Sequence, residues 1–314
     1  MIQPSLEVHV PISPTPTFFH MLQCLALSLR EFGGAYRNSP IVVTIGDDVI
    51  DTELEKRYPW FDALDIEVRW VSHGLFRRAS WFSTGIERYR YEYRSDVVLI
   101  LDADVFICDS FDEMITKVYA EQCFAGMTAH SSPFATQDPE ELQNWDSIFS
   151  GSEIDMPERS HYYSGGKEAG KGNPCPPYFN FGVQCAPAST MNIIGDVFYS
   201  LLTHVDAAMR GELEERRIFS CQIALTLALA KLDIPCYFLP PRFNFPTDRE
   251  FEKYYPDEAT NIRLLHALGS TLDKKVVFES VNNMKDVAAM KNLTGGNEAL
   301  RVVLDRVVGR VYAH

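Results

Sequence analysis

The sequence predicts an α/β fold with a mostly parallel central sheet that is flanked by helices. Short runs rich in Val and Ile alternate with segments of helical periodicity between residues 6 and 101. The run at 97–101 is wholly apolar, as expected for a strand with both faces buried. Strands that alternate with helices form right-handed βαβ units, and such units build parallel sheets.

The first third of the chain is predicted to supply the first half of this sheet. The helix at 18–32 has apolar residues three and four positions apart and ends at Gly33-Gly34. The strands are short apolar runs that end close to Pro, Gly or Asp. The predicted strands are 6–12, 41–45, 66–71 and 97–101, and the predicted helices are 18–32, 51–58 and 79–93.

The rest of the chain continues the alternation around one long irregular segment. Residues 150–177 are rich in Gly and Pro, and a loop of this length is usually functional or disordered. We expect either a lid that closes over a bound donor or a plain disordered insertion. The lid would offer His161, Tyr162, Tyr163, Lys167 and Lys171. The predicted helices are 111–119, 139–149, 191–209, 218–231 and 298–308, and the predicted strands are 123–127, 178–186, 236–239 and 263–266.

Composition excludes several classes of function. The chain has 314 residues, with 29 Lys and Arg against 43 Asp and Glu, and a net charge of −14 argues against a general nucleic-acid binder. Seven cysteines without a C-x-x-C pair indicate reduced thiols in a cytoplasmic protein. No run approaches the ~20 apolar residues of a membrane span, and no secretory signal pattern is present.

Two carboxylates follow the apolar strand 97–101 directly. Asp102 and Asp104 are separated by Ala103, so in an extended chain they point to the same side. Carboxylates are rarely buried without a partner. In open α/β sheets, ligands bind at the carboxyl ends of the strands. Asp102 and Asp104 are therefore a candidate site for a divalent cation.

Different chemistries use such a pair. In one, the carboxylates hold Mg²⁺ or Mn²⁺ that bridges the diphosphate of a sugar nucleotide, and a nucleotidyltransferase would use the same metal site. In another, Asp102 accepts a phosphoryl group and Asp104 is a general acid or base, as in haloacid-dehalogenase-type phosphatases. Asp104-Val105 fits the phosphatase pattern D-x-D-x-[T/V]. However, that nucleophile usually follows the first strand of its domain, whereas here three strand-like segments precede the strand that leads into Asp102.

Later motifs favour the sugar-nucleotide chemistry. These are PYFNFGV at 177–183, CQIALTLA at 221–228 with LPPRFN at 239–244, and LLHALG at 264–269. In this order after LDAD at 101–104, they resemble glycosyltransferases of the GT-A fold. The resemblance is greatest to the retaining family-eight type, which includes glycogenin and bacterial galactosyltransferases, and it spans residues 6–269. It implies metal-dependent transfer of a sugar from a nucleotide diphosphate, expected to be a UDP-sugar, to a hydroxyl acceptor with retention of configuration.

The resemblance also assigns roles to individual residues. It places Asp102, Asp104 and His266 around a Mn²⁺ or Mg²⁺ ion, and imidazole with carboxylates suits Mn²⁺. It places Asn180 and Gln222 near the transferred sugar as the candidate catalytic residues. The candidate donor-binding residues are Pro11, Ile12, Ser13, Asp47, Arg77, Arg78, Asp102, Ala103, Asp104, Gly182, His266 and Gly269.

The resemblance further implies a division of the chain. Residues 1–270 would form the glycosyltransferase domain, with a nucleotide-binding half at 1–109 and a sugar and acceptor half at 110–270. Residues 271–314 would form a C-terminal helical extension. The partners would be a nucleotide-sugar donor and a hydroxyl acceptor (a sugar, a glycan or a small molecule).

The sequence departs from the family pattern at two positions. Cys221 occupies the place of the Asp in the family's D-Q motif, which leaves open a catalytically inactive protein that binds sugar nucleotides. Leu272 occupies the place of a Lys that binds the diphosphate, so Lys274 or Lys275 would have to replace it. The pair Arg77-Arg78 lies where the family often has a basic residue, and one of the two is expected to hold a phosphate.

The nucleotide is expected at the ends of the first two strands. Pro11, Ile12 and Ser13 follow the first strand, and Asp47 or Asp48 follows the second. These residues offer hydrogen bonds to a base and ribose, for which uridine is implied by the resemblance alone. The alternative role for the two carboxylates is to cap a helix that begins near residue 51.

Overall fold

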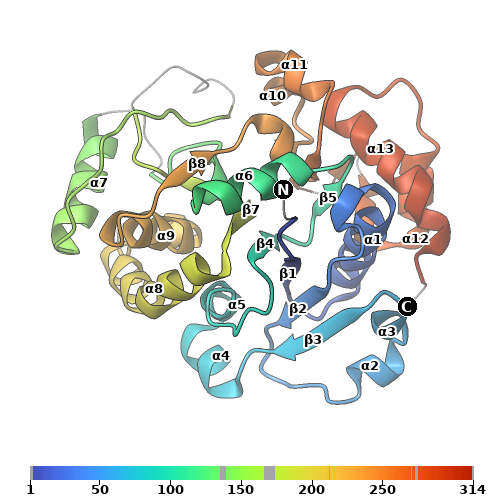
Figure 1. Ribbon diagram of the computed structural model, residues 1–314, viewed down its shortest axis with the longest axis horizontal. Coiled ribbons are helices and arrows are strands. Elements are labelled where there is room, and N and C mark those ends of the chain that lie inside the picture. Colours follow the sequence, from blue (N-terminus) through green and yellow to red (C-terminus); the bar gives the residue numbers. More distant parts are fainter. Residues whose placement is uncertain are drawn as a thin grey trace.

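A seven-stranded sheet forms the centre of the protein (Figure 1). This computed structural model describes residues 3–134, 139–165, 174–211, 213–269, 271–272 and 275–312. The strand order is β3-β2-β1-β4-β7-β6-β8; the first four are mutually parallel, and β7 is antiparallel to both of its neighbours. The strands are β1 (Leu6–Ile12), β2 (Ile41–Ile45), β3 (Ile66–Trp70), β4 (Val97–Leu101), β6 (Phe124–Thr128), β7 (Phe179–Pro187) and β8 (Cys236–Phe238). The predicted α/β class with a mostly parallel sheet is confirmed.

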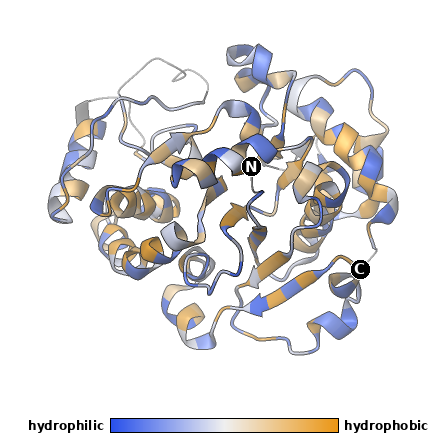
Figure 2. Ribbon diagram, in the orientation of Figure 1, coloured by the Kyte–Doolittle hydropathy of each residue, from blue (hydrophilic) through white to orange (hydrophobic). Residues whose placement is uncertain are grey.

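Helices cover both faces of this sheet. Alternate residues of β4 enter two separate apolar cores: Leu99 lies in one core, and Ile100 lies in the other. The first core contains α1 (Pro16–Phe32), α12 (Val281–Ala288) and α13 (Gly295–Val307), and the second contains α5 (Phe82–Glu87), α8 (Ala188–Ala208) and α9 (Ser220–Lys231). Figure 2 shows that apolar residues concentrate along the central strands. The wholly apolar sequence of β4 is thus explained by burial on both faces.

A second, three-stranded sheet carries part of the candidate site. Its order is β5 (Val105–Ile107), β10 (Leu264–His266) and β9 (Phe245–Pro246). β5 is antiparallel to β10, and the register places Val105 opposite His266. β9 is parallel to β10. This pairing brings the chain that follows Asp104 next to a residue more than 150 positions later.

Short elements connect these sheets and helices. The helices are α2 (Leu54–Arg57), α3 (Trp60–Ala63), α4 (His73–Ala79), α6 (Asp112–Glu121), α7 (Pro139–Gly151), α10 (Arg249–Tyr254) and α11 (Pro256–Ala259). The 3₁₀ turns are η1 (Gly34–Tyr36), η3 (Glu214–Phe219), η4 (Pro241–Phe243), η5 (Val277–Glu279) and η6 (Val308–Arg310). β11 (Thr271–Leu272) pairs with β12 (Lys275–Val276) in antiparallel orientation.

The helix predicted at 79–93 is wrong. The structure has two helices instead, because α4 ends at Ala79 and α5 runs only over Phe82–Glu87. Ser80 lies between them with φ 49°, a conformation that stops a helix. No glycine or proline marks this break in the sequence, which is why the pattern of apolar residues alone missed it.

The C-terminal segment packs against the rest of the chain. Helices α12 and α13 share their apolar core with α1, β1 and β10. The division of the chain at residue 270 therefore stays a prediction. None of the helices in the described residues has the length and apolar character that a membrane span requires.

Candidate functional site

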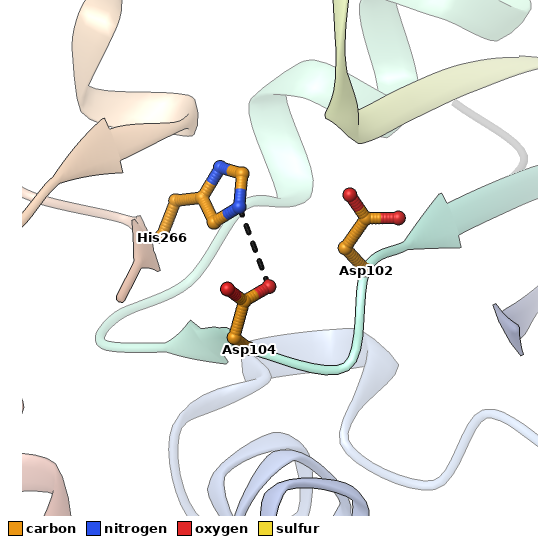
Figure 3. Close-up of side chains that lie close together, drawn as sticks. All are labelled: Asp102, Asp104 and His266. Atoms are coloured by element: carbon orange, nitrogen blue, oxygen red, sulfur yellow. Dashed lines mark ion pairs between the residues drawn. The ribbon is translucent and has the colours of Figure 1, made fainter. Parts of the chain in front are cut away.

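Asp102, Asp104 and His266 converge at the carboxyl end of β4. Each offers a ligand atom within 4.8 Å of those of the other two. Figure 3 shows the three side chains directed toward a common space. The two carboxylates do not lie on an extended strand as expected. They lie in a turn in which the Val105 amide donates to the Asp102 carbonyl (3.0 Å), because the chain leaves β4 there to enter β5 of the second sheet.

His266 is buried, and both of its ring nitrogens face polar atoms. Nε2 lies 3.3 Å from Asp104 Oδ1, and Nδ1 lies 3.0 Å from Asn244 Oδ1. Burial lowers the pKa of His266, but the negative charges of Asp104 and Asp102 outweigh it, so the pKa is raised overall. A bare nitrogen lone pair and a carboxylate oxygen repel one another at this distance. A proton or a cation between them removes the repulsion, so two carboxylates and an imidazole here fit a divalent cation.

Gly182 lies against this histidine, and Asn180 is linked to it through Asn244. A Cβ atom on Gly182 would come within 2.4 Å of His266 Cε1 and Nδ1. The space beside Gly182, a candidate donor-binding residue, is therefore taken by the His266 ring. Asn180 Oδ1 accepts hydrogen bonds from the Gly182 amide (2.8 Å) and from Asn244 Nδ2 (2.9 Å). Because its oxygen is used twice, Asn180 has only its amide hydrogens left to offer a ligand.

Arg88 is the basic residue that the structure places beside the carboxylates. Its Nη2 lies 3.5 Å from Asp102 Oδ1, and its guanidinium lies 4.6 Å from the centre of the Phe181 ring. The residue is 6% exposed, and its Nε and Nη1 have no hydrogen-bond partner among the described residues. Arg88 was not among the predicted site residues, because it lies within the segment 79–93, which was predicted to be a helix.

The expected pair Arg77-Arg78 lies elsewhere. Arg77 forms an exposed ion pair with Asp48 (3.4 Å), and Arg78 is also exposed. Among the described residues, neither arginine forms an ion pair with Asp102, Asp104 or His266. Lys275 pairs with Asp286, and Lys274 lies outside the described residues.

Helix α9 presents Cys221 and Gln222 in its first turn. Cys221 is buried against Gly85, where a Cβ atom would lie 2.9 Å from the Cys221 sulfur. Burial raises the pKa of the thiol to about 12, although the Arg88 charge opposes this, so Cys221 is neutral at physiological pH. Gln222 is half-buried. The Asp of the family motif is thus replaced by a small uncharged group next to Arg88.

The predicted nucleotide residues lie at the ends of two paired strands. β1 and β2 are parallel neighbours, and the Gly46 amide donates to the Ile12 carbonyl (3.1 Å), which places 11–13 beside Asp47. Ser13 is exposed, and Asp47 is half-buried. Asp47 accepts from the Asp48 amide rather than capping a helix, since α2 begins only at Leu54.

The structure describes part of the predicted lid at 150–177 and also the candidate donor-binding residue Gly269. His161 stacks on Phe238, and Tyr163 is buried with its hydroxyl bonded to Glu141, so neither is free to cover a ligand. Tyr162 is exposed, and the part of the segment at 166–173, with Lys167 and Lys171, lies outside the described residues. Gly269 has φ 75°, a conformation that favours glycine.

Comparisons with known proteins identify one family and several solved structures to which the chain is similar. A profile of the Rhodobacterales glycosyltransferase domain matches residues 18–233. No curated protein matches the sequence at a significant level. The galactosyltransferase LgtC, in complex with donor and acceptor sugar analogs, is similar in structure, with a TM-score of 0.54, 13% identity and 96% of both chains covered. An active-site mutant of LgtC has a TM-score of 0.51 and 15% identity, with 95% of both chains covered. Mouse xyloside xylosyltransferase 1 has a TM-score of 0.48 and 11% identity, with 85% of this chain and 99% of that chain covered.

Proposed function

Because the chain belongs to the Rhodobacterales glycosyltransferase family and has the GT-A fold, we propose that Asp102, Asp104 and His266 hold a divalent cation that binds the diphosphate of a nucleotide-sugar donor. The convergence of the three ligand atoms within 4.8 Å carries this proposal. Two carboxylates with an imidazole suit Mn²⁺ better than Mg²⁺, which prefers oxygen ligands and retains water. When bound, the cation stabilises negative charge on the leaving diphosphate.

Arg88 presents a fixed positive charge to the same nucleotide-sugar donor. Its guanidinium is held by Asp102 and the Phe181 ring, and its Nε and Nη1 lack partners in the described residues. A buried N–H group without a hydrogen-bond partner is unfavourable. An oxygen atom of the nucleotide-sugar would accept a hydrogen bond from it. Arg88 therefore takes the role that the sequence assigned to Arg77 or Arg78.

The ends of β1 and β2 bind the nucleoside. Pro11, Ile12 and Ser13 present backbone groups and a hydroxyl, and Asp47 presents a carboxylate at the adjacent strand end. In open α/β sheets, this edge is the usual place for a nucleotide. We expect uridine as the base, in line with the resemblance of the motifs.

The sugar is transferred to a hydroxyl group of an acceptor, with retention of configuration. Asn180 offers amide hydrogens to the donor sugar, and Gln222 lies on the first turn of α9 next to Cys221. Cys221 cannot accept hydrogen bonds as a carboxylate would, so the donor sugar is recognised without an anion at this position. The same neutral thiol favours the one competing function, an inactive protein that binds sugar nucleotides.

A thermal-shift experiment tests the cation and the base together. UDP, ADP and GDP are each added with Mn²⁺, with Mg²⁺ or without metal, and ligands that bind the folded state raise the melting temperature. We expect the largest shift with Mn²⁺ and UDP, and its loss in Asp104→Ala. The matched control is Asp62→Asn, since Asp62 is an exposed carboxylate on α3. A wild-type protein that gains nothing from Mn²⁺ with any nucleotide would overturn the proposal.

Release of UDP separates the enzyme from the inactive binder. UDP-galactose, UDP-glucose and UDP-N-acetylglucosamine are incubated with Mn²⁺ and the wild-type protein, and free UDP is measured. We expect slow release of UDP from at least one donor, because water replaces the missing acceptor. Binding of UDP without release from any donor would favour the inactive protein. The anomeric proton of a transfer product, observed by NMR, reports whether configuration is retained.

A further inference from the structure

The His266 ring is the end of a chain of hydrogen bonds that begins in the backbone of β7. The Gly182 amide can only donate, so the atom of Asn180 that faces it (2.8 Å) is the oxygen Oδ1. The same oxygen lies 2.9 Å from Asn244, so Asn244 must donate through Nδ2. The orientations of both amides follow from one backbone N–H group.

The proton position on His266 follows from the orientation of Asn244. With Nδ2 turned to Asn180, Oδ1 of Asn244 faces His266 Nδ1 at 3.0 Å. An amide oxygen only accepts, so Nδ1 carries the hydrogen whether the ring is neutral or protonated. Nε2 of the neutral ring then bears the lone pair, and it faces Asp104.

We infer that Asn244, oriented by Asn180, is a positioning residue that fixes His266 in the Nδ1–H tautomer and so directs the Nε2 lone pair to the cation. This inference rests on the proposed cation site. Outer partners of this kind orient the histidine ligands of metals. Asn244 is fully buried directly before β9, whose pairing with β10 sets its distance from His266.

The network has a consequence for the coupling of two parts of the site. Asn180 is the residue expected to contact the donor sugar, and its oxygen orients the amide that sets the tautomer of a cation ligand. A change at Asn180 therefore reaches the cation through Asn244. The structure links the sugar end and the cation end of the site through three side chains.

NMR of the cation-free protein tests the tautomer without relying on cation binding. In wild-type protein at a pH high enough to neutralise the ring despite the nearby Asp104 carboxylate, the ¹⁵N shifts of His266 should show a protonated Nδ1 and a bare Nε2. The His266→Gln variant assigns the signals. In Asn244→Leu we expect loss of this tautomer preference, because no acceptor faces Nδ1. In Asn244→Asp the preference should persist, because one carboxylate oxygen still accepts from Nδ1–H, while the other faces Asn180 Oδ1 and no longer donates to it.

Mn²⁺ binding, measured by the electron paramagnetic resonance of the free ion, tests the consequence. We expect Asn244→Leu to bind Mn²⁺ about 10 to 100 times more weakly than wild type, and Asn244→Asp to restore most of the affinity. Thermal unfolding identifies variants that fail to fold. A neutral wild-type ring with its hydrogen on Nε2 overturns the inference, as does an Asn244→Leu variant with unchanged tautomer and Mn²⁺ affinity. If wild-type protein shows the expected tautomer but binds no Mn²⁺, the proposed cation site fails while the hydrogen-bond network stands.

Discussion

Replacing Gly182 with alanine adds one methyl group at the most crowded point of the candidate site. The new Cβ would lie 2.4 Å from His266 Cε1 and Nδ1 and 2.9 Å from Asn180 Oδ1. Gly182 does not have a positive φ, so the backbone itself accepts alanine and the strain comes from contact alone. Non-bonded carbon atoms prefer a separation of about 3.5–4.0 Å, so the ring or β7 must move by about 1 Å.

A shift of this size is large for a metal ligand. His266 is held at Nδ1 by Asn244 and is 4% exposed, so the ring cannot turn away without breaking that bond. Metal–ligand distances tolerate about ±0.2 Å. We therefore expect Gly182→Ala to weaken Mn²⁺ binding by at least about tenfold, the lower end of the loss seen when support for a ligand is removed. Overpacking should also lower the free energy of unfolding by about 1–3 kcal/mol.

Two measurements on the same samples check this expectation. Isothermal calorimetry gives the Mn²⁺ affinity, and urea unfolding followed by circular dichroism gives the free energy of unfolding. The matched control is Gly74→Ala on α4, where a Cβ atom would meet nothing within 4 Å. That control should bind Mn²⁺ as wild type does. A folded Gly182→Ala variant with wild-type Mn²⁺ affinity would show that His266 does not ligate the cation.

Three further predictions follow from the same geometry. Arg88→Met should lower kcat/KM for the donor by about 10- to 100-fold, as expected for loss of hydrogen bonds to a charged group, while Arg78→Met leaves donor-hydrolysis kinetics unchanged. Burial, with the His266 charge, lowers the pKa of His130 to about 4 despite Asp248. Only the unfolded state then takes up this proton as the pH falls from about 6.5 to about 4, so the free energy of unfolding decreases by up to about 3 kcal/mol over that range. Urea unfolding of His130→Gln should show a smaller decrease. Removal of metal by a chelator should stop UDP release, and added Mn²⁺ should restore it; UDP release that survives chelation would contradict the role of the cation.

The parts of the fold that carry a strong local pattern could be predicted from the sequence. The β4 strand was predicted with its observed bounds, because a strand buried on both faces has to be apolar at every position. The placement of Asp102 and Asp104 after that strand followed directly. The family and the GT-A fold are also confirmed, and they rested on the order of four motifs rather than on any one of them.

The rest of the site depends on contacts that leave no local signal. β5 and β9 have three and two residues and were not predicted. A strand was predicted at 263–266, but nothing local in the sequence shows that it pairs with β5, and this pairing brings His266 to Asp104. Arg88 resembles an ordinary helix-surface charge in the sequence, but in the structure it is buried beside Asp102 and the Phe181 ring. Asn244 lay within a quoted motif, but its role depends on a neighbour 64 positions away, Asn180.

The charges of the site explain how an acidic protein can bind an anionic donor. Without a cation, Asp102 and Asp104 outweigh Arg88, and protonation of His266 brings the group only to neutrality. A divalent cation replaces that proton and makes the group positive, so Mn²⁺ and the diphosphate should bind cooperatively. Coupling of this kind is typically about 1–3 kcal/mol, or about 5- to 150-fold, and it is reciprocal. Calorimetry should therefore find that Mn²⁺ tightens UDP binding by the same factor by which UDP tightens Mn²⁺ binding; UDP affinity that does not depend on Mn²⁺ would refute this electrostatic account.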